Sequence, residues 1–131
     1  MRAIRFLPIL SLMLMACHDG ARKLVGDYRL RQTTAPATGG GVDTSYFLWN
    51  TARPENEVAW SGAILRIGWD AQHIVALLAP PNTPYGIKEG WMVIDLSRGT
   101  HVAALTDAQL QQQPGVAQIK TVRSDSVWAQ M

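Results

Sequence analysis

Length, composition and charge exclude several classes of protein. The chain has 131 residues, 47% of them hydrophobic and five of them tryptophan, which suits one domain with a hydrophobic core. Lys and Arg number 12 against 10 Asp and Glu, and this near-balance argues against the clustered basic face that nucleic-acid binding requires. Cys17 is the single cysteine, so no intrachain disulfide can stabilise the fold.

The N-terminus has the features of a secretion signal. Arg2 and Arg5 precede an apolar run of eleven residues, 6–16, which is too short to cross the roughly 30 Å core of a bilayer as a helix. The run closes with Leu14-Met15-Ala16-Cys17, which resembles the lipobox of bacterial lipoproteins. Loss of the two arginines would leave ten basic residues against ten acidic ones, so the mature chain is expected to be neutral.

The lipobox resemblance implies how the protein is processed and where it is found. Residues 1–16 would be removed and Cys17 acylated, with palmitate among the expected groups. A polar tether, 17–23, would then join the membrane to a single domain, 24–131. His18 rather than Asp follows the cysteine, which in Gram-negative lipoproteins implies the outer membrane, facing the periplasm. The alternatives are an uncleaved anchor and an apolar N-terminus packed into the core.

Alternating apolar and polar residues predict strands along most of the mature chain. The predicted strands are 24–31, 46–49, 63–69, 73–79, 91–96 and 101–105. Turn residues at 70–72 and 97–100 join the last four strands into two β-hairpins. Clusters of Gly, Pro and polar residues predict loops at 33–44, 51–57 and 80–90.

The C-terminal part is predicted to contain one short helix. Thr106 and Gln109 have the spacing of a capping box, and the helix is expected to run to about Gln113, before Pro114-Gly115. The segment 116–131 is ambiguous, but its β-branched residues favour one or two strands that could cover an open sheet edge. The predicted fold is mainly β, an antiparallel meander of about six strands with a short helix near the C-terminus. A parallel α/β sheet is excluded because helices and strands do not alternate.

Two short motifs support the β prediction through a second resemblance. Gly26-x-Tyr28-x-Leu30 and Trp91-x-x-Ile94-Asp95 are similar to motifs of small uncharacterised bacterial lipoproteins. The chain departs from the second motif, because Gly90 precedes a single Trp. The resemblance implies a β-rich domain and carries no activity.

The sequence offers no recognisable catalytic or metal-binding set. His18, His73 and His101 lack the spacing of zinc ligands, and Cys17 is expected to be acylated, so no metal or other cofactor is predicted. No G-x-S-x-G motif is present. Asp70 and Asp95 could form a carboxylate pair, but Asp70 is expected to open a turn, and Asp95 either to face solvent or to cap backbone groups near a strand end. The chain is therefore predicted not to be an enzyme.

Aromatic side chains are the best candidates for binding. Trp69, in phase with Leu65 and Ile67, and Trp91 are expected to face the core. Trp49 and Trp60 lie beside the polar loop 51–57, and Tyr85 lies in the proline-rich loop, where amphipathic rings suit interfaces and ligand grooves.

Three functions follow as hypotheses. The first is a membrane-anchored, non-catalytic module that binds an envelope protein, as an accessory subunit or as an immunity or inhibitor protein. The second is a lipoprotein that binds a small ligand or a cell-wall glycan through the candidate binding residues Trp49, Trp60 and Tyr85. The third is an enzyme of unrecognised type.

Overall fold

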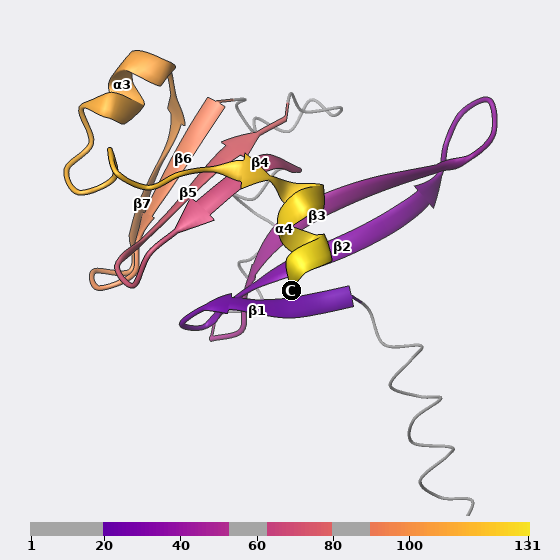
Figure 1. Ribbon diagram of the computed structural model, residues 1–131, viewed down its shortest axis with the longest axis horizontal. Helices are drawn as coiled ribbons and strands as arrows, with labels where there is room; N and C mark the ends of the chain where they lie inside the picture. Colours follow the sequence, from indigo (N-terminus) through magenta and orange to yellow (C-terminus); the bar gives the residue numbers. More distant parts are fainter. Residues whose placement is uncertain (1–19, 53–62, 80–89) are drawn as a thin grey trace, which may run out of the picture.

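The computed structural model describes residues 20–52, 63–79 and 90–131, and these form two antiparallel sheets with two short helices (Figure 1). The first sheet has the order β1-β2-β3, with β1 (Gly20–Val25), β2 (Tyr28–Pro36) and β3 (Val42–Asn50). The second has the order β7-β6-β5-β4-β8, with β4 (Ile64–Trp69), β5 (His73–Leu78), β6 (Gly90–Asp95), β7 (Thr100–Leu105) and β8 (Val122–Arg123). The helices are α3 (Asp107–Gln111) and α4 (Ser124–Gln130). The predicted mainly β, antiparallel fold is confirmed, with eight strands in place of about six. Neither helix in these ranges has the length and apolar character needed to cross a bilayer.

The first sheet begins earlier than the sequence predicts. β1 starts at Gly20, inside the segment 17–23 predicted as a tether. The predicted strand 24–31 is two strands, because Val25 pairs with Tyr28 across a turn at Gly26 and Asp27. Gly26 has a φ of 57°, which costs glycine little because it has no Cβ. This polar segment is a strand because it pairs with β2. Its residues do not alternate between apolar and polar types, so the sequence pattern did not predict a strand there.

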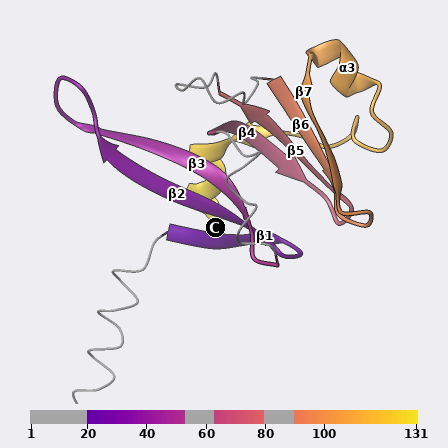
Figure 2. The ribbon, with the colours of Figure 1, turned by 180° about the vertical axis from the view of Figure 1, so that it is seen from behind.

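β2 and β3 form a long ribbon that projects from the rest of the fold (Figures 1 and 2). Their register runs without a break from Tyr28 opposite Asn50 to Pro36 opposite Val42. The predicted loop 33–44 therefore contracts to the residues between the two strands, 37–41. The predicted aromatic strand 46–49 is the part of β3 nearest the core.

Both predicted hairpins are confirmed, and they supply four of the five strands of the second sheet. β4 pairs with β5, β5 with β6, and β6 with β7. Leu65 departs from the expected core alternation, since it is 50% exposed. The register shifts between Ile64 and Arg66, and a bulge of this kind changes which side chains point inward.

The C-terminal segment covers the β4 edge as predicted, but most of it is not strand. β8 pairs with β4 at only two positions, Ile67 with Val122 and Arg66 with Arg123. α4 follows at once, where strands were expected. The Ser124 hydroxyl donates a 2.8 Å hydrogen bond to the Ile64 carbonyl, so the start of α4 is held against the second sheet.

Hydrophobic clusters lie on both faces of the second sheet. The larger cluster joins the two sheets and α4 through Leu30, Leu48, Ile64, Ile67, Ile74, Ala76, Leu78, Met92, Ile94, Val127 and Trp128. The smaller cluster lies on the opposite face, where Val75 and Val93 pack with Val116. Trp69 and Trp91 are partly buried against the larger and the smaller cluster respectively. The second sheet is therefore covered on both sides, which explains its nearly continuous apolar strands β5 and β6.

Trp128 connects α4 to the first sheet. The Arg22 guanidinium lies over its ring at 4.1 Å from the centroid and donates a hydrogen bond of 2.5 Å to its carbonyl oxygen. Tyr46 of β3 lies beside it, with ring centroids 5.9 Å apart. Cation–π and tilted aromatic contacts both favour this placement.

Gly68 provides a test of the β4–β8 contact. An added Cβ would collide with the backbone carbonyl of Lys120, so Gly68→Ala should push the segment before β8 away from β4. We expect a loss of about 1–3 kcal/mol in the free energy of unfolding, measured by denaturant titration. Leu65→Ala in the same strand is the control, and its loss should be under about 1 kcal/mol because Leu65 is half exposed. Equal losses in the two variants would contradict the close approach at Gly68.

Candidate functional site: a polar recess beside the β7 edge

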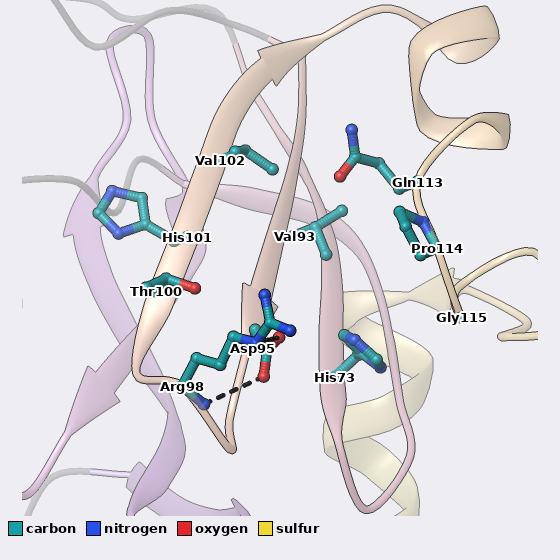
Figure 3. Close-up of a pocket in the computed structure, with 10 residues that line it drawn as sticks. All are labelled: His73, Val93, Asp95, Arg98, Thr100, His101, Val102, Gln113, Pro114 and Gly115. Atoms are coloured by element: carbon teal, nitrogen blue, oxygen red, sulfur yellow. Dashed lines mark hydrogen bonds and ion pairs between the residues drawn. The ribbon is translucent and has the colours of Figure 1, made fainter.

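A polar recess of about 440 Å³ lies on the face of the second sheet turned away from the first sheet. Figure 3 shows it between the ends of β5, β6 and β7 and the loop that follows α3. It is lined by His73, Val93, Asp95, Arg98, Thr100, His101, Val102, Gln113, Pro114 and Gly115.

Strand register brings residues distant in the sequence together in this recess. His73 of β5 lies opposite Asp95 of β6, and Asp95 lies opposite Thr100 of β7. His73 therefore shares a sheet face with both of them. The loop after α3 passes close to the His73 imidazole at Gly115, where an added Cβ would lie 3.1 Å from the His73 Cε1 atom. The absence of a side chain at Gly115 allows this close approach.

Asp70 and Asp95 both hold turns at this end of the sheet. Asp70 Oδ1 accepts hydrogen bonds from the backbone N–H groups of Gln72 at 2.8 Å and His73 at 2.7 Å. Asp95 Oδ1 accepts from the Ser97 hydroxyl at 2.7 Å, and from the backbone N–H groups of Ser97 and Arg98 at 3.1 Å each. The turn and capping roles predicted for these two carboxylates are confirmed.

These hydrogen bonds keep both carboxylates ionised. The Gln72 N–H is the main cause that lowers the pKa of Asp70 below its ordinary value of 3.8. The Ser97 hydroxyl is the main cause that lowers the pKa of Asp95 below the same value. A general acid needs a raised pKa, so neither carboxyl group is set up to donate a proton near neutral pH.

The two histidines of the recess do not converge. His73 is 15% exposed, and its Nδ1 lies 3.8 Å from Asp70 Oδ1, too far for a hydrogen bond. His101 lies on the other side of β7 from His73 (Figure 3). Within the ranges 20–52, 63–79 and 90–131, no three His, Cys, Asp or Glu side chains are grouped so that they could hold a metal ion.

β7 forms an open edge of the sheet next to the recess. Among the described strands it pairs only with β6. Val102 is 44% exposed, and Arg98, just before the strand, has a side chain that is 80% exposed. The register shifts between Trp91 and Val93, and Ala104 has a φ of 59°. This bulge ends the regular edge, which therefore covers roughly the first four residues of β7.

α3 leads into the loop that lines the recess, and the sequence predicted part of its contacts. Thr106 and Gln109 form the expected capping box, with hydrogen bonds of 2.9 and 3.2 Å, although the helix ends at Gln111 and not at about Gln113. Trp91 Nε1 donates a 2.7 Å hydrogen bond to Asp107. This bond joins β6 to the first turn of α3.

The predicted aromatic site is not assembled within the described residues. Trp49 lies on β3 in the first sheet and does not line the recess, and its ring has the Arg31 guanidinium 5.5 Å from its centroid. Its Nε1 is buried and has no hydrogen-bond partner there. Trp60 and Tyr85 lie outside the described residues, so the three candidates cannot be placed together.

The recess was not predicted from the sequence. The two predicted hairpin turns, 70–72 and 97–100, were the sequence feature that pointed to this part of the sheet. Because successive strands are antiparallel, both turns lie at the same end of the sheet. The register that sets His73 opposite Asp95 depends on the β5–β6 pairing, which no local pattern specifies.

The turn carboxylates predict a pH dependence of stability. Because the folded pKa of Asp95 lies below its ordinary value, its contribution is complete above that value and is lost as the pH falls through the folded pKa. Asp95→Ala should therefore be less stable than the wild type at neutral pH, and the difference should shrink on acidification towards about pH 2.

Denaturant titrations between neutral pH and about pH 2 measure this difference. Asp43→Ala, on the exposed β2–β3 ribbon, controls for the loss of one negative charge. A difference between wild type and Asp95→Ala that grows as the pH falls would contradict the capping role of Asp95.

No protein-family model, curated protein or solved structure matches this chain.

Proposed function

We propose that the chain is a lipid-anchored protein of the bacterial envelope that binds a protein partner and catalyses no reaction. The observation that carries this proposal is the open β7 edge beside the polar recess. An exposed edge strand offers unpaired backbone groups to an extended segment of another chain. Side chains of that segment could reach the recess, where Arg98, Thr100 and Gln113 offer polar groups.

The chemistry of the recess supports binding over catalysis. The carboxylate of Asp95 in the recess already accepts hydrogen bonds from the backbone N–H groups of the turn and from the Ser97 hydroxyl. His73 and His101 lie on different sides of β7. A nucleophile, a base and an orienting group within reach of one another are the minimum for most hydrolytic sites, and these side chains do not supply that arrangement.

Glycan binding is the less supported alternative. It would use the ring faces of Trp49, Trp60 and Tyr85 as stacking surfaces. One face of the Trp49 ring has Arg31 over it, which leaves less of this ring for a sugar. The anchor in the outer membrane, facing the periplasm, remains part of the proposal and rests on the lipobox resemblance at Cys17.

A photo-crosslinking residue at position 102, in the full-length protein in its native membrane, tests the β7 edge. We expect one discrete crosslinked species, because Val102 is exposed on the proposed binding strand. The matched control carries the same residue at position 118, which is exposed but lies after the recess loop. The same species from both positions, or none from position 102, would overturn binding at this edge.

The mass of the N-terminal peptide tests the anchor. The mature protein should begin at Cys17 and carry acyl mass, and Cys17→Ser should give an unacylated form. A wild-type protein without acyl mass on this residue would overturn the proposed anchor and leave the β7 result unaffected.

A further inference from the structure

The β7 edge presents exposed side chains on both faces of the second sheet. The first four residues of the strand, 100–103, are all exposed. Side chains alternate along a strand, so Thr100 and Val102 lie on the face that carries the recess, and His101 lies on the other side of β7 (Figure 3). A strand added to this edge therefore meets side chains on both faces as well as the backbone groups of the edge.

Symmetry restricts how a second copy of β7 could pair with this edge. Two identical edge strands that pair antiparallel are related by a two-fold axis perpendicular to the sheet. This axis keeps every residue on its own face, and residues directly opposite each other share a face, so one residue of β7 must lie opposite itself. Val102 is the largest apolar side chain of the exposed stretch, and it is 44% exposed. A pairing centred on Val102 therefore buries two valine side chains against each other.

The charges at the two ends of β7 suit a pairing centred on Val102. Arg98, before the strand, has a side chain that is 80% exposed, and its Nε lies 3.8 Å from Asp95 Oδ2, too far for a hydrogen bond. Asp107, after the strand, is exposed. In the antiparallel pair the start of each strand lies beside the end of the other, so Arg98 approaches Asp107 of the second copy. Arg98 is four positions before Val102 and Asp107 is five after it, and the bulge within β7 takes up the additional residue.

The same two-fold axis is compatible with attachment of both copies to one membrane. The first sheet and the recess lie on opposite faces of the second sheet, so the axis places both first sheets on one side of the joined sheet. β1 begins at Gly20, three residues after Cys17, and both proposed anchors therefore lie on that side. Attachment to one membrane raises the effective concentration of the copies, which favours a contact as small as one short strand pair.

We propose that the β7 edge binds the β7 edge of a second copy of the chain, so that two five-stranded sheets form one continuous antiparallel sheet. The inference deepens the proposed function, because it rests on binding at the β7 edge and names the partner. Backbone hydrogen bonds between the two strands, the Val102 pair and two contacts between Arg98 and Asp107 make up the interface.

A disulfide at position 102 tests this pairing in the full-length protein in its native membrane. Cys17 is the single cysteine and is expected to be acylated, so Val102→Cys introduces the only free thiol. Directly opposed residues of an antiparallel pair have Cα atoms about 4.5–5.5 Å apart, within the usual disulfide range of about 4.4–6.8 Å. Mild oxidation should therefore give a covalent dimer of twice the mass of the chain.

Val122→Cys is the matched control. Val122 is also 44% exposed and lies on β8, the strand at the opposite edge of the same sheet. We expect its dimer yield to be at least about tenfold lower than that of Val102→Cys, because position 122 does not face itself across the proposed axis. The wild type, oxidised in parallel, measures any disulfide formed by Cys17.

Charge reversal tests the contacts at the strand ends. Arg98→Asp and Asp107→Arg, each combined with Val102→Cys, should lower the dimer yield roughly fivefold, because each replaces two attractive pairs with two repulsive ones. The two reversals together should restore the yield to within about twofold. Within one chain the two side chains lie at opposite ends of β7, so this rescue requires a contact between copies. A denaturant titration of each variant confirms that it is folded, since Asp107 also accepts the Trp91 hydrogen bond.

The identity of the crosslinked species separates this inference from the proposed function. A disulfide dimer from position 102 that the double reversal rescues supports both. A photo-crosslinked species from position 102 that contains a different protein, with no disulfide dimer, would support the proposed function and overturn pairing between copies. Equal dimer yields from positions 102 and 122, or failure of the double reversal to rescue the folded protein, would overturn the pairing centred on Val102. Absence of every crosslinked species from position 102 would overturn both.

Discussion

The burial of Trp128 is the contact on which the arrangement of the two sheets depends. No strand pairing joins the sheets in the described residues, so side chains must hold them together. Trp128 packs under Arg22 and beside Tyr46 of the first sheet, while Ser124 at the other end of α4 bonds to Ile64 of the second. A seven-residue helix is unstable alone in water, and α4 is stabilised by the core that it completes.

This architecture gives the two sheets different surfaces. The second sheet carries a hydrophobic cluster on each face, and the β7 edge and the polar recess are among its open parts. The first sheet has one face against the core, and its other face carries Lys23, Arg29 and Arg31. The sheet register therefore places these three basic side chains on the face of the first sheet that is turned away from the core.

Local patterns predicted those elements whose stabilising contacts are also local. The two hairpins of the second sheet, the capping box at Thr106 and Gln109, and the turn roles of Asp70 and Asp95 depend on residues within a few positions of one another. Predictions were wrong where distant partners decide the conformation. Residues 20–23 are a strand because β2 pairs with them, and Leu65 is exposed because of a bulge.

The sequence by itself determined the β-rich class and the antiparallel hairpins, and it predicts lipid attachment at Cys17. These predictions depend on residue types and short spacings, and they do not require the conformation of the rest of the chain. Only the tertiary structure decided that the strands divide into two sheets, that α4 joins them, and that His73, Asp95 and Thr100 share one recess. The physical reason is that sheet register and inter-sheet packing are set by contacts between residues far apart in the chain. The free energy of these contacts cannot be inferred from a short stretch of sequence.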